Sequence, residues 1–151
     1  MVKGPFLFAG YLKDGEVDQA VLDQNGFFDT GDLGVMNEER FLHLTGRVKN
    51  IIRRGAETVP VSLLEDVIAS HPDVLNAVVV GIADERLGEV PFACVQLRPG
   101  ATFSFGDIER LFAEQRLTKK FWPVGMKVFD EWPTGPTGKI DRRMILSSLN
   151  V

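Results

Sequence analysis

The sequence has only one cysteine and two histidines among its 151 residues. A single cysteine excludes an internal disulfide and any metal site built from a cysteine cluster. The histidines, His43 and His71, lie far apart in the sequence, so there is no pattern for a histidine-based metal site or nucleophile. We therefore expect no metal site made by this chain, and we expect Cys94, in an apolar strand-like run, to be a small buried hydrophobe.

Runs of basic residues and long apolar runs are also missing. No five basic residues follow one another and the net charge is −4, which gives little support to a nucleic-acid or membrane-surface role. No apolar stretch approaches the roughly 20 residues that span a bilayer. The N-terminus shows no charged and apolar regions of a secretory signal. We expect a cytoplasmic protein with no membrane span and no nucleic-acid partner, and the lone cysteine fits a reducing compartment.

Residues 1–46 predict β hairpins joined by tight turns. Asn25 followed by Gly26 is a strong hairpin turn signal, and the polar residues 37–40 separate two apolar runs. No segment of helical period is present to cover these strands, and so few residues of hairpin bury too little surface to stand alone. We therefore interpret residues 1–46 as the β-rich end of a large N-terminal domain.

Residues 47–151 predict a small domain of the α+β class, with a central sheet flanked by helices. It begins with a basic hairpin over residues 47–58 that turns at Gly55. Ser62 and Glu65 form a capping-box pattern at the start of a helix that ends before Pro72. The further expected elements are strands at residues 74–82, 91–97 and 126–129, a helix begun by Ser104 and Asp107, and a last helix capped by Asp141.

The segment Pro-Thr-Gly-Pro-Thr-Gly-Lys at residues 133–139 carries the most chemistry. Gly135 and Gly138 permit positive φ and close approach of the backbone to a ligand. Lys139 offers a mobile cation that can neutralise a carboxylate or phosphate oxygen. The segment is not a Walker loop, because Ile140 stands where Ser or Thr would bind magnesium. A solvated turn before the last helix is the structural alternative.

A second motif is Asp-Thr-Gly-Asp at residues 29–32. Ionised Asp29 and Asp32 can accept hydrogen bonds from the hydroxyls of a ribose, and a plain polar turn is the structural alternative. An apolar residue followed by Asp-Thr-Gly also marks aspartic proteases, in which two such carboxylates share a proton. Asp32 adds a negative charge that would disturb that dyad, so we favour the nucleotide interpretation.

Between these motifs lies a cationic cluster of Arg47, Lys49, Arg53 and Arg54, followed by Gly55. Such a cluster can line the path of a phosphate or nucleotide. The alternative is that alternating charges cover the solvated face of a hairpin.

In this order and spacing, the motifs resemble the C-terminal part of AMP-forming acyl-CoA synthetases. Their superfamily of adenylate-forming enzymes includes luciferases and peptide-synthetase adenylation domains. Residues 27–33 match its aromatic-x-Thr-Gly-Asp motif, and residues 133–139 match its last motif with the lysine. Residues 46–49 are similar to the hinge motif between its two domains. The resemblance covers almost the whole chain.

The resemblance implies a two-step reaction. ATP, with Mg²⁺, and a carboxylic acid form an acyl-adenylate and pyrophosphate, and the thiol of CoA then displaces AMP. By resemblance, Lys139 bridges the substrate carboxylate and the α-phosphate during adenylation. The partner of this domain is the enzyme's own large N-terminal domain.

The same resemblance implies roles for the other motifs. Asp32 would hold the ribose hydroxyls of AMP with help from Arg47, and Lys49 would be the hinge between the two half-reactions. The loop of Arg53, Arg54 and Gly55 would face the pantetheine channel, where Gly55 leaves room for the thiol arm.

The chain departs from the family pattern in places. Gly135 stands where the family commonly has Thr, and Ala56 and Glu57 follow Gly55 where related ligases often have Glu-Asn. Nothing in the chain resembles the phosphate loop or the acyl pocket of the family, so we expect the chain to be inactive alone. The acyl specificity cannot be read from this part of the enzyme; the overall character of the chain only leans towards a medium-chain or cyclic carboxylic acid, within fatty acid metabolism. A non-catalytic binding or regulatory module of the same fold is the alternative function.

Overall fold

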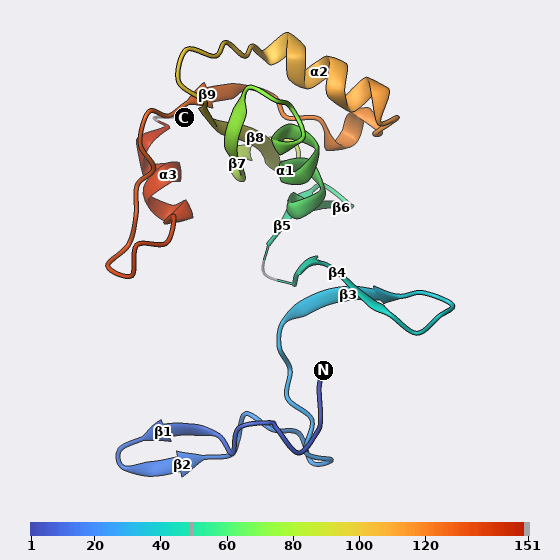
Figure 1. Cartoon of the computed structure of the whole chain (residues 1–151), viewed down its shortest axis with the longest axis vertical. Coiled ribbons are helices and arrows are strands. Elements are labelled where there is room, and N and C mark those ends of the chain that lie inside the picture. Colours follow the sequence, from blue (N-terminus) through green and yellow to red (C-terminus); the bar gives the residue numbers. More distant parts are fainter. Residues whose placement is uncertain (49, 150–151) are drawn as a thin grey trace. The chain divides into compact units, whose positions relative to one another are not determined.

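The computed structural model describes residues 1–48 and 50–149. The chain divides into two compact units, Met1–Lys49 and Asn50–Val151 (Figure 1). We describe each unit by itself.

The first unit contains two antiparallel hairpins. Strand β1 (Tyr11–Lys13) pairs with β2 (Glu16–Asp18), and β3 (Asp32–Met36) pairs with β4 (Leu42–Arg47). The β3–β4 hairpin is the one predicted around the polar residues 37–40, and it is confirmed. The signal at Asn25 and Gly26 forms a turn that is flanked by an isolated bridge between Leu22 and Phe28, and Phe28 also bridges to Val2.

Apolar side chains of the β3–β4 hairpin remain in contact with solvent. Val35, Met36, Leu42 and Leu44 are each between 58 and 68 % exposed. Among the described residues, every buried hydrophobic side chain lies in the second unit. The first unit therefore has little hydrophobic stabilisation of its own, since burial of apolar area is the main driving force of folding.

The second unit is built on a five-stranded sheet with the strand order β6-β5-β8-β7 and with β9 also paired to β8. The long antiparallel ladder of β7 with β8 forms its centre, and β9 runs parallel to β8. Strand β7 is therefore an edge strand. The strands are β5 (Ile51–Arg54), β6 (Glu57–Pro60), β7 (Val74–Asp84), β8 (Gly88–Leu97) and β9 (Met126–Val128).

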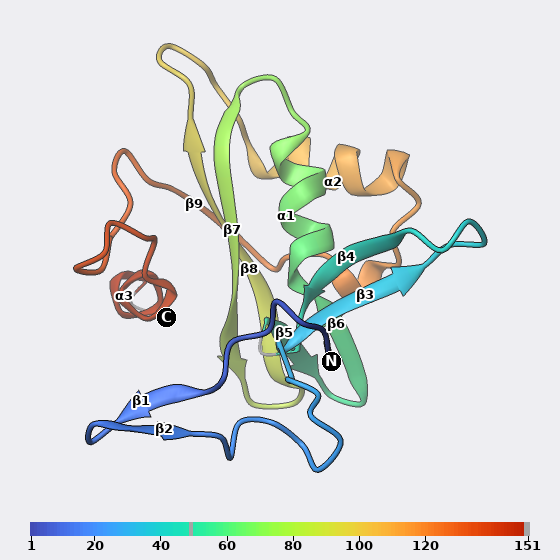
Figure 2. The same cartoon turned by 60° about the horizontal axis from the view of Figure 1, so that its bottom comes forward.

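Helices cover both faces of the sheet. Figure 2 shows α1 (Val61–Ala69) and α2 (Phe105–Glu114) on one side of the β7–β8 ladder and α3 (Arg142–Ser148) on the other. A short 3-10 turn, η1 (Lys119–Phe121), follows α2. This arrangement confirms the predicted α+β class with a sheet flanked by helices. Among the described helices, none is both long and apolar enough to cross a membrane.

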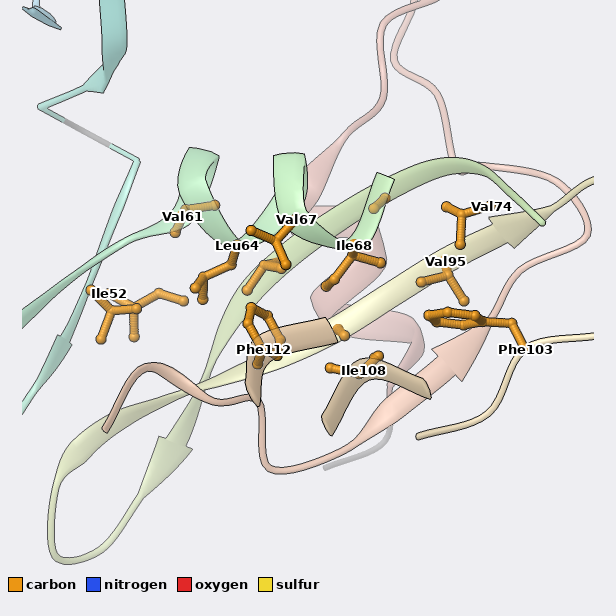
Figure 3. Packing of buried hydrophobic residues seen from close by; sticks show 14 residues of the cluster. Ile52, Val61, Leu64, Val67, Ile68, Val74, Val95, Phe103, Ile108 and Phe112 are labelled. Carbon is orange, nitrogen blue, oxygen red and sulfur yellow. The ribbon is translucent and has the colours of Figure 1, made fainter. Parts of the chain in front are cut away.

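The alternation of side chains along β7 produces two hydrophobic clusters. Ala77 and Val79 face the cluster under α1 and α2, whereas Val78 and Val80 face the cluster under α3. In Figure 3 the side chains of α1 and α2 converge on one interior, where Phe112 is fully buried. Full burial of a side chain of this size contributes about 1.5–3 kcal/mol to folding.

Two predicted helix starts are confirmed. Ser104 and Asp107 form the reciprocal capping box of α2, and the Asp141 carboxylate accepts hydrogen bonds from two backbone amides at the start of α3. Ser104 donates to the Asp107 carboxylate, and these hydrogen bonds lower the pKa of Asp107. Cys94 is fully buried, as predicted. Burial raises the pKa of its thiol to about 12.

Two local predictions are wrong. Ser62 does not cap α1, because the helix already begins at Val61 with Pro60 at the capping position, and Glu65 turns to the sheet instead. The basic hairpin does not begin at Arg47, which ends β4; it runs from Ile51 in β5 to the end of β6.

Candidate active-site segments

The loop that carries Lys139 is closed by its own backbone. Thr134 and Ile140 form an antiparallel bridge, the Gly135 amide donates to the Lys139 carbonyl at 2.9 Å, and the Asp141 amide donates to the Pro133 carbonyl at 2.9 Å. The structure therefore places Lys139 on a small braced hairpin between β9 and α3.

Two glycines shape this hairpin. Gly138 has φ of +75°, a conformation that L side chains rarely adopt, so the turn before the lysine requires glycine. A Cβ at Gly135 would lie 3.9 Å from the Lys139 carbonyl oxygen and 4.0 Å from an Asp141 carboxylate oxygen, which are ordinary contacts. Position 135 therefore has room for a Cβ atom.

The side chain of Lys139 is exposed. None of the ion pairs found between described residues involves its ammonium group. Its charge is therefore available to an anionic ligand, on a loop whose backbone is closed by hydrogen bonds. The same loop is also a solvated turn before α3. Its geometry therefore fits both the interpretation as a lysine loop that binds a ligand and the alternative of a plain turn before the last helix.

The Asp-Thr-Gly-Asp motif forms a turn that uses two of its own side chains. Asp29 Oδ1 accepts a hydrogen bond from the Gly31 amide at 2.8 Å, and Thr30 Oγ1 accepts one from the Asp32 amide at 3.1 Å. Gly31 adopts φ of +67°. The Asp32 carboxylate takes no part in this turn.

Asp32 and Arg47 are opposite residues of the β3–β4 ladder. Arg47 Nε lies 3.0 Å from Asp32 Oδ1, with 25 % of the Asp32 side chain and 67 % of the Arg47 side chain exposed. The structure therefore brings together two predicted nucleotide-binding residues from motifs that are separate in the sequence. Asp32 keeps a second oxygen that can accept hydrogen bonds.

Of the predicted loop, Arg53 and Arg54 are the last residues of β5, and Gly55 begins the turn to β6. Gly55 has φ of +62°, and its amide donates to the Leu87 carbonyl at 2.7 Å. Arg53 is exposed, whereas Arg54 is half-buried and donates from Nη1 to the Lys120 carbonyl at 2.8 Å. One of these two arginines therefore contributes to the domain's own structure. The alternative of a solvated hairpin face fits the exposed Arg53 but not the half-buried Arg54.

A surface hollow of about 320 Å³ lies beside this turn. Lys120 lines it and forms an ion pair of 2.5 Å with Glu57. Among the described residues, the buried Arg54 Nε has no hydrogen-bond partner. No sequence motif links Lys120 to the turn at Gly55, which lies about sixty residues earlier in the chain. The hollow is lined by Arg54, Gly55, Ala56, Glu57, Leu87 and Lys120.

The predicted hinge residue, Lys49, lies outside the described residues. The Asp32–Arg47 pair belongs to the first unit, and the Lys139 loop and the Gly55 turn belong to the second. Within the second unit these two segments come from different elements, since one follows β9 and the other joins β5 to β6.

Comparison with known proteins identifies the family. The family model of the AMP-binding enzyme C-terminal domain matches residues 63–139, slightly more than half of the chain. The chain is 36 % identical over 144 residues to luciferin 4-monooxygenase of Nipponoluciola cruciata, covering 95 % of this chain and 26 % of the relative. It is 35 % identical over 144 residues to medium-chain fatty-acid–CoA ligase of Escherichia coli K12, with 95 % and 25 % covered.

A comparison with solved structures leads to the same family. The solved structure of o-succinylbenzoate CoA synthetase from Bacillus subtilis, in complex with its acyl-adenylate intermediate, superposes with a TM-score of 0.80 at 32 % identity, over 95 % of this chain and 29 % of that one. The chain therefore belongs to the AMP-binding enzyme C-terminal domain family of the adenylate-forming superfamily. It spans about a quarter of the length of the curated relatives it matches. These matches favour the nucleotide interpretation of residues 29–32 over the protease alternative.

Proposed function

We propose that this chain is the lysine-bearing C-terminal part of an ATP-dependent carboxylate–CoA ligase, which forms acyl-CoA through an acyl-adenylate. The observation that carries the proposal is the exposed Lys139 ammonium group on the C-terminal leg of a braced loop, with no ion pair to any described residue. A cation presented in this way can stabilise the charge that builds between a carboxylate and the α-phosphate of ATP. The enzyme would work in the cytoplasm with ATP, Mg²⁺ and CoA.

The other segments take complementary roles in this proposal. Asp32 accepts hydrogen bonds from the ribose of AMP, and Arg47 orients its carboxylate through the 3.0 Å contact. Arg54 and Gly55 line the hollow that would take the pantetheine arm of CoA, together with Lys120, and the exposed Arg53 directly precedes them in the chain. Lys49 is the hinge about which the second unit turns between the two half-reactions, because one site must run two chemistries in sequence.

A larger N-terminal domain completes the enzyme in this proposal. The exposed apolar side chains of β3 and β4 support this, since contiguous apolar surface commonly marks an interaction face. The isolated chain should not form acyl-adenylate, because nothing in its sequence resembles the phosphate loop or the acyl pocket of the family. Release of pyrophosphate by the isolated chain at the rate of a complete ligase would contradict this part of the proposal.

The decisive experiment replaces Lys139 with Ala in the complete enzyme and measures the two half-reactions separately. Adenylation should fall by on the order of 10² to 10³-fold, as when one transition-state donor is removed. Thioester formation from supplied acyl-adenylate and CoA should stay within about threefold of the wild-type rate, because the lysine acts only before CoA arrives.

The acyl acceptor and the alternative function are tested in the same assays. The rate of acyl transfer to CoA is compared with the rates to an amine and to another thiol. This comparison shows whether CoA is the preferred second substrate. If the Lys139→Ala variant keeps both half-reactions, the alternative of a non-catalytic binding or regulatory module of this fold is supported instead.

A further inference from the structure

Glu65 and Arg142 meet at the outer edge of β7. Glu65 Oε1 accepts hydrogen bonds from the Val79 amide at 2.8 Å and from Arg142 Nη2 at 2.7 Å. Arg142 Nη1 donates to the Val79 carbonyl at 2.8 Å. Because β7 is the last strand of the sheet, these backbone groups have no neighbouring strand to bind. The two side chains satisfy both of them.

The pair also joins the two faces of the sheet. Glu65 comes from α1, which packs on the cluster that contains Val79, and Arg142 is the first residue of α3, which packs on the opposite cluster. The contact thus passes around the edge of the sheet. The Glu65 side chain is 18 % exposed and the Arg142 side chain 34 %. Hydrogen bonds between charged groups that are partly shielded from water are stronger than exposed ones.

Arg142 lies three residues after Lys139 on the same leg of the loop. Ile140 on this leg packs against the cluster under α3, and Asp141 caps that helix. The other leg begins after Trp132, whose ring stacks on Phe129 with centroids 5.3 Å apart. The Lys139 leg is therefore fixed to the rest of the domain chiefly at its C-terminal end, where Arg142 binds β7 and Glu65.

We propose that the Glu65–Arg142 pair is a positioning element that holds the Lys139 loop in register with the sheet, so that its ammonium group reaches the reacting phosphate during adenylation. This inference rests on the proposed function of Lys139. A displacement of about 1 Å at a catalytic group can cost on the order of 10²-fold in rate. Because Lys139 acts in one half-reaction only, loss of the pair should slow adenylation and spare thioester formation.

The test uses Glu65→Ala, Glu65→Gln and Arg142→Ala in the complete enzyme. Each alanine variant should lower kcat of adenylation by about tenfold to 10²-fold, with smaller changes in KM, as expected for a misplaced catalytic group. Glu65→Gln keeps an acceptor for the Val79 amide and removes the charge, so its loss should be smaller. Thioester formation from supplied acyl-adenylate should stay within about threefold in all three variants.

The matched control is Lys127→Met, which removes the hydrogen bond from Lys127 Nζ to the Ser148 carbonyl at the other end of α3. It loosens the same helix away from Lys139 and should leave adenylation within about threefold. An adenylation loss in Lys127→Met equal to that in Arg142→Ala would show that general loosening of α3 is responsible, and would overturn the proposal.

A second measurement separates positioning from simple loss of fold. In a Lys139→Ala background, Glu65→Ala should cause no further loss of adenylation, because the pair acts through the lysine. Additive losses would overturn the proposal, and so would full adenylation in both alanine variants. If Lys139→Ala alone leaves adenylation intact, the proposed function itself fails; if only the Glu65 and Arg142 variants are silent, this inference alone fails.

Discussion

Asp32 and Arg47 face each other across the β3–β4 hairpin, and Arg47 Nε lies 3.0 Å from Asp32 Oδ1. The side chains of Asp29 and Thr30 hold the turn of residues 29–31 through hydrogen bonds. The Asp32 carboxylate is not used in this turn and pairs with Arg47. The hairpin therefore presents one oriented carboxylate with an adjacent cation. This arrangement suits a ribose, whose hydroxyls donate hydrogen bonds to a fixed acceptor.

The first prediction concerns this carboxylate. In the complete enzyme, Asp32→Ala should raise KM for ATP by about 10- to 100-fold, since a hydrogen bond to a charged group is worth about 1.5–3 kcal/mol. Both half-reactions should be affected, because the nucleotide stays bound through both. Initial-rate kinetics with varied ATP measure the effect.

Asp29→Asn is the matched control for Asp32→Ala. It removes a carboxylate three residues earlier but keeps an oxygen that can accept from the Gly31 amide. We expect less than about a threefold change in KM for ATP, because the turn is preserved. Equal losses in the two variants would show that the motif acts only as a turn.

The second prediction concerns the capping box of α2. Hydrogen bonds from the Ser104 hydroxyl and amide lower the pKa of Asp107 below its usual range. A folded-state pKa below the unfolded one stabilises the fold above the unfolded pKa of about 3.9, and this stabilisation is lost as the pH falls through the folded pKa. Asp107→Asn should therefore lower Tm at pH 6, and the difference from wild type should shrink below about pH 4.

Thermal melts followed by circular dichroism across this pH range measure the difference. Arg110→Ala serves as the control, because it removes the exposed partner of Asp107 and leaves the capping box intact. Exposed ion pairs contribute little to the free energy of unfolding, so we expect Arg110→Ala to change Tm only slightly. A Tm difference for Asp107→Asn that stays constant down to pH 3 would argue against the capping carboxylate as its cause.

The third prediction concerns Cys94. The thiol is fully buried in the cluster under α3, and burial raises its pKa to about 12. Since the thiolate is the reactive form, the native protein should not react with a thiol reagent at pH 8 on the minute timescale. In denaturant the single thiol should react fully. Rapid labelling of the native protein, with the melting curve unchanged, would show that this cluster opens more readily than its packing indicates.

Much of the second unit could be predicted because its signals are local. Ser104 and Asp107 lie within one helical turn, and Asp141 directly precedes the amides that it caps. The apolar run at residues 74–82 predicted the buried strand correctly. Ser62 and Glu65 have the same spacing as a capping box, yet that prediction was wrong, since Glu65 binds an edge strand and an arginine 77 residues later.

The sequence by itself determined the class of fold and the family. Caps and turns depend on residues that are neighbours in the chain, and the motifs are recognised by their order and spacing, so neither requires knowledge of tertiary contacts. It also determined which lysine ends a glycine-rich loop. Only the tertiary structure decided that Glu65 and Arg142 close the edge of β7 around Val79, and that Lys120 lies beside Gly55. These contacts join residues that are far apart in the chain, and their partners are selected by how the sheet and helices pack rather than by any local pattern.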